Sequence, residues 1–238
     1  MIAPSMFLIF EDRLSDSRFV ERVWRCQSER AGTFLSMAAC HWEMVVTRHR
    51  GKAFLTVRGP ETKATTADCP AEGEWVGIRF KLGTFMPLLP ARNLSDRKDV
   101  TLPGITSRSF WLHGSAWEYP DFENAETFVR RLVHDGLIVL DGAVDAVLQG
   151  QRQDLSVRSA QRHFLQATTH SMIRQIERAR HATNLLKQGV CILDTVHQAG
   201  YYDQAHLTRS LKYLIGQTPA QIMRAQKQLS FLYKTRSS

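Results

Sequence analysis

The stretch from Cys191 to Pro219, CILDTVHQAGYYDQAHLTRSLKYLIGQTP, decides how the rest of this chain is interpreted. Its first part carries apolar residues at helical spacing and stops at Gly200, where a residue without Cβ can take the positive φ that closes a helix. Asp203 stands where a second helix should begin, because its carboxylate can accept hydrogen bonds from the free amides of the next turn. Residues 205–214 then place leucines on one side. The stretch therefore predicts a helix, a tight turn and a second helix.

The outer face of this second helix is predicted to be polar. Gly200 permits a sharp turn between two steeply crossing helices, and the exposed side chains of the second helix carry amide, hydroxyl and cationic groups that bind base edges and phosphates. We predict that base contacts come from Gln204, Thr208 and Arg209, and a backbone contact from Lys212. Of the two tyrosines in the turn, residues 201 and 202, we expect one to pack beneath it.

A second copy of the pattern lies earlier in the chain. Residues 156–165 (SVRSAQRHFL) superimpose on residues 203–212 (DQAHLTRSLK) at an offset of 47 residues, with cap matching cap and apolar positions matching apolar positions. Helical spacing turns the apolar side chains of this first copy inward and leaves Arg158, Gln161 and Arg162 on the opposite face. These three residues are therefore candidate DNA contacts.

The segment between the copies, residues 171–188, predicts one connecting helix of about 17 residues, ~25 Å long at 1.5 Å per residue. Two reading helices held apart by such a rod suit successive major grooves on one face of a duplex, roughly 34 Å apart. Two alternatives remain open at this point. One is that the polar faces are solvated and contact no ligand, and the other is that Arg162 and Arg209 hold a phosphate or an internal carboxylate instead of a base.

Residues 154–224 resemble the paired helix-turn-helix domain of the AraC/XylS family of bacterial transcription regulators. The pattern that carries the resemblance is Gly200-Tyr201-Tyr202-Asp203-Gln204-Ala205-His206-Leu207-Thr208-Arg209, followed by Leu211-Lys212 and Gly216-Gln217-Thr218-Pro219. The first half departs from it, since Thr168-Thr169-His170-Ser171-Met172 stands where the family usually has Gly-x-Ser-Pro. The resemblance implies a transcription regulator that binds double-stranded promoter DNA, with RNA polymerase, a small-molecule effector and a second copy of the chain as further partners.

Composition limits the class of protein. A chain of 238 residues with 43% hydrophobic residues can form one large or two modest domains. There is no run of about 18 apolar residues, and the apolar patch near the N-terminus is too short for a signal peptide, so we expect a cytoplasmic protein without a membrane span. The cysteines show no C-x-x-C pairing and are expected to be reduced thiols: Cys26, Cys40, Cys69 and Cys191.

Charge is unevenly distributed along the chain. Of the formal net charge of +8, residues 141–238 hold +7, with 13 Lys and Arg against 6 Asp and Glu. Residues 1–140 hold +1, with 18 basic and 17 acidic residues. A basic excess confined to one half is the electrostatic footprint of phosphate contacts, although a cationic surface that serves solubility is the alternative.

The predicted fold class is α+β. Residues 1–120 predict a β-rich effector-binding or dimerisation domain, with strands in short β-branched and aromatic runs at 33–39, 44–49, 53–57, 75–80 and 110–112. Residues 19–26 fit a helix or a strand, and 82–94 a broken helix or loop because of its prolines. By resemblance, such a domain is sensor-like and of the cupin-like barrel type.

The C-terminal part is predicted to be all-helical. A helix at 124–132 within a bridging segment at 121–140 would connect the two domains. Residues 141–238 would form the DNA-binding domain, two helix-turn-helix modules joined by the connecting helix, and residues 141–149 would be its first helix.

Candidates for an effector site are few. Aromatic walls with one or two polar groups are typical of small-molecule pockets, and this pattern selects Trp42, Glu43, Arg79, Phe80 and Trp111. Structural packing of the same aromatics is the alternative. Residues 40–43 combine thiol, imidazole, indole and carboxylate, but without metal-ligand spacing and on alternating strand faces. We therefore expect no metal site and no cofactor.

An enzyme fused to a DNA-binding domain is the alternative function, for example a DNA-repair alkyl acceptor that uses Cys40 or Cys69. Neither cysteine lies in a motif with a paired base, and the chain has no Ser/His/Asp arrangement and no glycine-rich phosphate loop. We therefore expect no enzyme and no catalytic residue. A third hypothesis, an architectural DNA binder without sequence preference, is also open.

Overall fold

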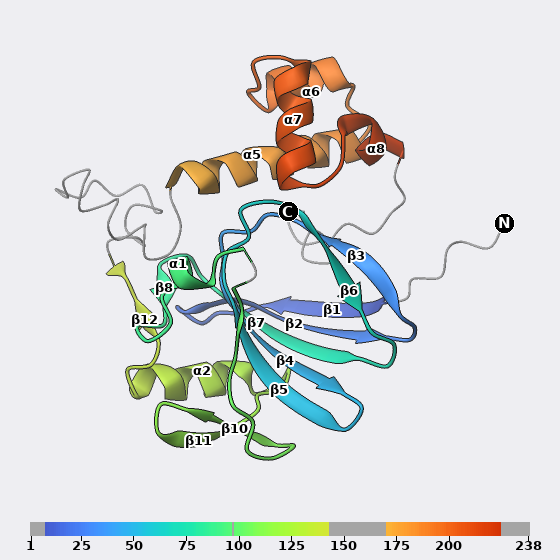
Figure 1. Cartoon of the computed structure of the whole chain (residues 1–238). Coiled ribbons are helices and arrows are strands. Elements are labelled where there is room, and N and C mark those ends of the chain that lie inside the picture. Colours follow the sequence, from blue (N-terminus) through green and yellow to red (C-terminus); the bar gives the residue numbers. More distant parts are fainter. Residues whose placement is uncertain (1–7, 97, 143–169, 225–238) are drawn as a thin grey trace. The chain divides into compact units, whose positions relative to one another are not determined.

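The structure is a computed structural model that describes residues 8–96, 98–142 and 170–224 (Figure 1). The chain forms two compact units, and each is built from segments that are separate in sequence. The first unit contains Met1–Gly32, His41–Pro60 and Cys69–Thr168, and the second contains Thr33–Cys40, Glu61–Asp68 and Thr169–Ser238. The predicted division at residue 120 differs from this arrangement, because two segments before residue 120 belong with the C-terminal helices.

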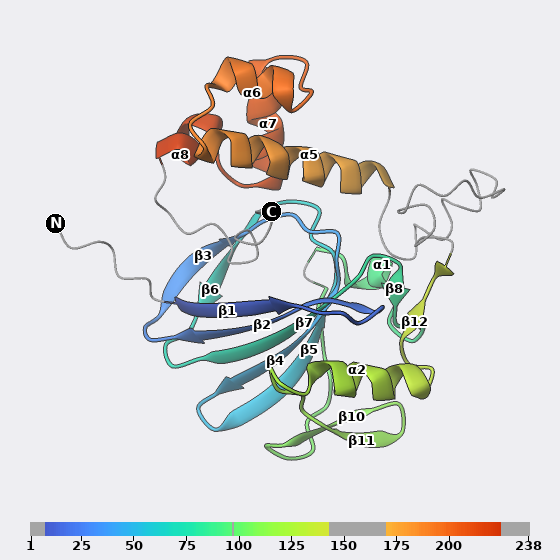
Figure 2. The same ribbon diagram turned by 180° about the vertical axis from the view of Figure 1, so that it is seen from behind.

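The first unit is built on an open six-stranded antiparallel sheet, whose long strands lie side by side in Figure 2. Its order is β1 (Leu8–Leu14), β2 (Val20–Ser28), β7 (Glu74–Phe80), β4 (Glu43–His49), β5 (Lys52–Arg58) and β9 (Val100–Thr101). The predicted strands at 44–49, 53–57 and 75–80 are confirmed as β4, β5 and β7. The segment at 19–26 belongs to strand β2.

Two hairpins of this unit share one turn chemistry. Arg50 (φ 50°) and Gly51 (φ 71°) join β4 to β5, and both take the left-handed conformation. His113 (φ 48°) and Gly114 (φ 78°) do the same between β10 (Ser109–Leu112) and β11 (Ser115–Glu118). Two consecutive residues with positive φ give the turn whose twist matches the right-handed twist of antiparallel strands. These turns therefore fix the register of both hairpins.

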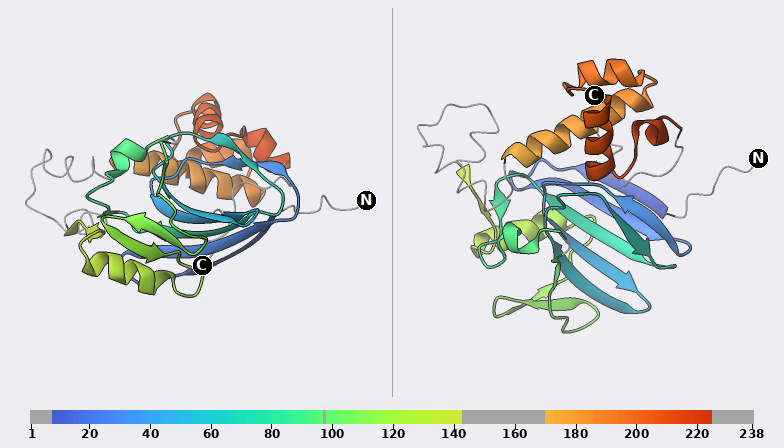
Figure 3. Two further views of the ribbon diagram at one scale, coloured as in Figure 1. Left: turned by 60° about the horizontal axis from the view of Figure 1, so that its bottom comes forward. Right: turned by 45° about the horizontal axis from the view of Figure 1, so that its top comes forward.

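The sheet of the first unit is curved (Figure 3), and the hydrophobic core lies on one of its faces. Val23, Ile78 and Met44 occupy neighbouring positions on β2, β7 and β4, and all three are fully buried. Helix α2 (Ala125–His134) contributes its apolar side to the same core, and its Phe128 contacts rings of the β10–β11 hairpin. The helix predicted at 124–132 is thus confirmed, and it packs within the first unit.

Short elements complete this unit. Strand β8 (Thr84–Phe85) pairs with β12 (Val139–Leu140), and one turn of helix, α1 (Ala91–Leu94), follows Pro90. The proline-containing segment at 82–94 is therefore a short strand followed by a single helical turn.

Within residues 170–224, the described part of its C-terminal segment, the second unit contains four helices: α5 (His170–Lys187), α6 (Ile192–Gln198), α7 (Gln204–Leu214) and α8 (Pro219–Arg224). Ile176, Ala179, Val196, Leu207 and Leu211 are among the side chains that form its buried interior. The connecting helix predicted at 171–188 is confirmed as α5. Residues 143–149 of the helix predicted at 141–149 lie outside the described residues, and so does the repeat at 156–165.

Two further segments belong to the second unit, Thr33–Cys40 and Glu61–Asp68, and we call them together the arm. Strand β3 (Gly32–Ser36) pairs with strand β6 (Thr65–Cys69), and Ala39 and Glu61 exchange backbone hydrogen bonds of 2.8 and 2.9 Å. The strand predicted at 33–39 corresponds to β3. Strands β1, β6 and β11 were not expected from the sequence.

Candidate nucleic-acid interface

The turn between α6 and α7 is closed at both ends by the residues that the sequence singled out. Gly200 takes φ 68°, and the following amide of Tyr201 donates to the Val196 carbonyl at 2.9 Å, which ends α6. At the start of α7, the Asp203 carboxylate accepts a hydrogen bond of 2.6 Å from the His206 amide. The predicted helix end and the predicted N-cap are both confirmed.

Helix α7 has one buried side and one open side. Leu207 and Leu211 are fully buried and Leu214 is nearly so, which holds the helix against the rest of its unit. The predicted contact residues lie away from this leucine row. Gln204, Arg209 and Lys212 are exposed and Thr208 is half-buried. Among the described residues neither Arg209 nor Lys212 makes an ion pair, so both cationic groups can meet a ligand.

Thr208 is partly committed within its own helix. Its hydroxyl donates to the Gln204 carbonyl at 2.8 Å, one helical turn earlier. This leaves the lone pairs of the hydroxyl oxygen as acceptors. Thr208 is therefore suited to accept from a base amino group rather than to donate.

Tyr201 packs beneath the turn, as expected for one of the two tyrosines. It is 6% exposed, and its hydroxyl lies 3.1 Å from the Ser210 hydroxyl of α7. The Arg178 guanidinium of α5 lies 4.6 Å from the ring centre and donates to the Gly200 carbonyl at 3.3 Å. Tyr202 is 91% exposed beside it and has its ring free for contact with a ligand. The candidates Arg158, Gln161 and Arg162 lie outside the described residues.

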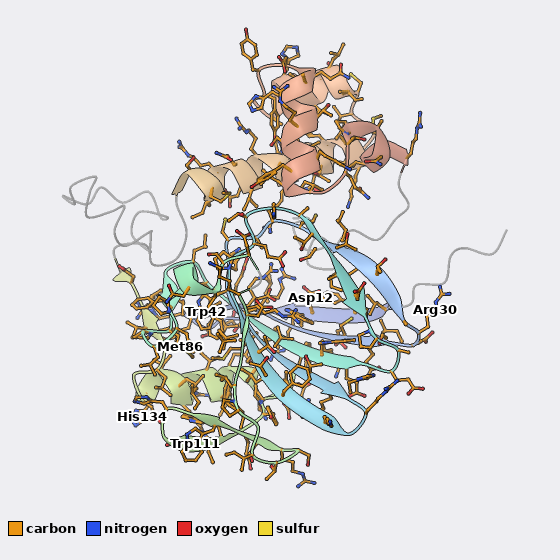
Figure 4. The ribbon with its side chains drawn as sticks, in the orientation of Figure 1. Asp12, Arg30, Trp42, Met86, Trp111 and His134 are labelled. Atoms are coloured by element: carbon orange, nitrogen blue, oxygen red, sulfur yellow. The ribbon has the colours of Figure 1, made fainter. Side chains whose placement is uncertain are left out.

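The five effector candidates of the first unit fall into three separate places. Trp42 and Phe80 stack at 3.8 Å inside the hydrophobic core, where the Trp42 indole donates to the Thr84 carbonyl at 2.6 Å. Trp111 is 46% exposed on the β10–β11 hairpin and lies well apart from Trp42 in Figure 4. Glu43 and Arg79 form an ion pair, and these two residues lie on the opposite face of the sheet from the core.

Glu43 and Arg79 belong to a buried ionic row that crosses four adjacent strands, β4, β7, β2 and β1. The Arg79 guanidinium donates to the Glu43 carboxylate at 2.8 Å, and the position across from Arg79 on β2 is Arg22. Arg22 forms an ion pair with Asp12 of β1, which Figure 4 labels. Burial, together with the adjacent Arg79 cation, lowers the pKa of Arg22. Sequence reasoning missed Arg22 and Asp12, although ionic residues inside apolar strands are a visible signal.

A β-bulge in β2 creates this row. Val20 pairs with Phe80, yet Arg22 pairs with the next residue of β7, Arg79, so Glu21 is an extra residue in the strand. Without the extra residue, Val20 and Arg22 would lie on the same face, because side chains alternate with a period of two. The bulge therefore places Val20 in the core and Arg22 on the ionic row.

The thiols of Cys40 and Cys69 are poorly suited to nucleophilic chemistry. Burial raises the pKa of Cys40 to about 12, and it also raises the pKa of Cys69. The thiolate is the nucleophilic form, and at neutral pH both side chains are therefore held as thiols.

Comparison with known proteins gave no match: no family model fits the chain, and no curated protein or solved structure is significantly similar to it. None of the helices in the part of the chain that the structure describes is long and apolar enough to cross a lipid bilayer.

Proposed function

We propose that the protein is a sequence-specific DNA-binding transcription regulator and that α6, the turn and α7 form a helix-turn-helix reading module. The observation that carries the proposal is the two-sided character of α7. The helix is fixed by a buried leucine row and an Asp203 cap. On its open side it exposes an amide, a guanidinium and an ammonium group, and the two cationic groups form no ion pair within the part of the chain that the structure describes. A rigid helix with such a surface fits into the major groove, and its polar groups complement the donors and acceptors of the base edges there.

Each exposed group has a defined role in this proposal. The planar guanidinium of Arg209 suits O6 and N7 of guanine, and the Gln204 amide suits N6 and N7 of adenine, at about 1–3 kcal/mol for each good bidentate contact. Thr208 accepts from a base amino group, since its proton is already donated within the helix. Lys212, as a flexible point charge, contacts a phosphate.

The proposal extends to the first copy of the pattern and to the first unit. Arg158, Gln161 and Arg162 would read a second half-site, so that one chain contacts two major-groove segments. The charge of +7 on residues 141–238 supports the required phosphate contacts. The first unit would be the cupin-like sensor that the resemblance implies, with Glu43 and Arg79 as its polar contacts to a small-molecule effector.

The alternative, an alkyl acceptor fused to a DNA reader, has less support. Such a reaction needs a thiolate that is both reachable and deprotonated. Cys40 is 6% exposed and Cys69 is 4% exposed, and burial raises the pKa of each thiol. Neither property suits attack on a methylated base.

Selection of bound sequences from a random duplex library tests the proposal, with the full chain at ~150 mM salt so that non-specific electrostatics are partly suppressed. We expect one or two short motifs. Arg209→Ala should weaken binding to the selected duplex by about 10- to 100-fold and relax the preference at one position, which corresponds to 1–3 kcal/mol. Lys212→Ala should weaken binding to all sequences alike. It should also reduce, by about one, the slope of the log binding constant against log salt concentration.

Gln198→Ala is the matched control for Gln204→Ala, because Gln198 is an exposed glutamine of α6 outside the reading helix. Only the α7 variant should change the selected motif. Two results would contradict the proposal. One is the recovery of no motif, which would favour an architectural binder, and the other is a motif that survives both Gln204→Ala and Arg209→Ala unchanged.

A further inference from the structure

The C-terminal end of α7 is completed by backbone groups from a distant part of the chain. The last carbonyls of any helix lack partners within the helix and must be satisfied by other donors. Here the Tyr213 carbonyl accepts from the Ala64 amide at 2.8 Å, and the Leu214 carbonyl accepts from the Ala38 amide at 2.9 Å. Both donors belong to the arm, which is part of the same compact unit as α7.

Side chains close the same junction. Gly216 follows α7 with φ 83°, and a Cβ at this position would stand 2.8 Å from both methyl carbons of Leu35 and 3.1 Å from the Ala64 Cβ. Arg180 of α5 donates to the Ala38 carbonyl at 3.4 Å, and Ala38 is fully buried. The arm therefore contacts the end of α7 with backbone and side chains together.

The junction lies at the C-terminal end of α7, whereas the base-reading candidates Gln204 and Thr208 lie toward its N-terminal end. The helix has 11 residues, about 16 Å at 1.5 Å per residue, and the arm contacts its last two residues. Gln204 and Thr208 lie in its first two turns. The arm thus leaves the reading face open while it restrains the tilt of the helix. Restraint matters because a binding constellation must be held within about 0.5 Å and 10–20° of its productive geometry.

We propose that the arm is the positioning element of the reading helix, with the amides of Ala38 and Ala64 and the side chain of Leu35 as positioning residues. The consequence for DNA rests on the function proposed above. The chain joins each arm segment directly to segments of the first unit, at Gly32, His41, Pro60 and Cys69. A change of state in the first unit thereby has a covalent route to the end of α7.

Two variants of the full chain test the proposal. Ala64→Pro removes one of the two amide donors, and Leu35→Asp puts a charge against Gly216. The matched controls are Lys63→Ala and Thr33→Asp, because both residues are exposed positions of the same arm. Leu35→Met keeps an apolar side chain and should behave like the wild type.

Amide hydrogen exchange without DNA is the first readout. We expect the amides of residues 211–216 to exchange about tenfold faster in Ala64→Pro and Leu35→Asp, since the last turn of α7 then opens more often. The amides of β4 and β7 should exchange at wild-type rates in both variants. The two control variants should show no acceleration in α7.

Affinity for the selected duplex and for a random duplex is the second readout. Ala64→Pro should weaken binding to the selected duplex about tenfold. The affinity for the random duplex, and the slope of its log binding constant against log salt concentration, should stay unchanged because no charge is removed. Wild-type amide exchange rates in α7 of both variants would overturn the proposal. Faster amide exchange in α7 together with an unchanged preference for the selected duplex would also overturn it, because the arm would then have a purely structural role. If the wild-type chain selects no DNA motif, the proposed function fails. The amide exchange rates of residues 211–216 in the variants still decide whether the arm restrains the end of α7.

Discussion

Replacing Gly77 by alanine should destabilise the first unit strongly, for a reason that can be read from its neighbour across the strands. Gly77 of β7 lies opposite Trp24 of β2, and the indole covers the glycine. A Cβ at position 77 would stand 1.9 Å from Cε2 and 2.3 Å from Nε1 of Trp24. The indole is 8% exposed and stacks on Phe10 at 6.0 Å between ring centres, so it has little room to move.

The expected cost follows from these distances. Ordinary carbon contacts are about 3.5–4.0 Å, so the new methyl group would overlap the indole by well over 1 Å. Overpacking of a buried site usually costs about 1–3 kcal/mol, and an overlap of this size places Gly77→Ala near 3 kcal/mol. Gly73→Ala is the matched control. Its Cβ would stand 2.2 Å from Trp75, but that indole is half-exposed and can swing away, which limits the cost to about 1 kcal/mol.

Urea unfolding followed by tryptophan fluorescence measures both variants. All five tryptophans belong to the first unit, so the signal reports on that unit alone: Trp24, Trp42, Trp75, Trp111 and Trp117. Trp24→Leu in the Gly77→Ala background should recover part of the lost free energy, because the smaller side chain makes room for the methyl group. Equal losses for Gly77→Ala and Gly73→Ala, or a loss below about 1 kcal/mol for Gly77→Ala, would refute the reasoning.

Two further predictions concern charges at helix starts. Asp203→Ala should cost about 1 kcal/mol of helix stability, because the hydrogen bond to the His206 amide is lost. The loss should be measurable as faster amide exchange in the first turn of α7. Asp203→Asn should keep most of the stability, because its side-chain oxygen can still accept that bond. An equal effect of both variants would contradict the capping role. The Arg13 hydrogen bonds lower the pKa of Glu126 below its ordinary 4.5, so the pair stabilises the fold above that value and the stabilisation disappears as pH falls through the lowered pKa. Glu126→Gln should therefore lower the free energy of unfolding by about 0.5–1 kcal/mol at pH 7, measured by urea titration. The effect is modest because the side chains of the pair are about one-third exposed. Near pH 3 the substitution should make little difference to the free energy of unfolding.

Local sequence signals were sufficient where one residue decides one structural feature. Gly200 and Asp203 define the turn and the start of α7 because positive φ and N-capping are properties of single residues. Strands β4 and β7 were visible from runs of β-branched and aromatic residues. Strand β2 was ambiguous because its alternation is interrupted near the bulge. Arg22, Val23 and Trp24 are buried in succession, and only residues 24–28 alternate between buried and exposed.

Pairing between distant segments was beyond the reach of such signals. Glu43 and Arg79 were both selected as site residues, but their contact depends on the register of β4 against β7. The position of Arg22 beside Arg79 depends on the bulge in β2. Neither register nor bulge has a local signature in this chain. The hydrogen bonds from Ala38 and Ala64 to α7 were equally invisible, because a backbone amide has no residue identity that marks its partner.

The composition of the second unit from three separate segments has a consequence for how this chain can evolve. In a chain whose two parts are each one continuous segment, a single crossover between the parts leaves each part whole. Here a crossover anywhere between residues 69 and 168 would transfer the four C-terminal helices without Thr33–Cys40 and Glu61–Asp68. The transplanted helix α7 would arrive with the carbonyls of Tyr213 and Leu214 unpaired and Gly216 uncovered. The two halves of this gene are therefore expected to be inherited together, and a hybrid would function only if its new partner supplied an equivalent pair of strands.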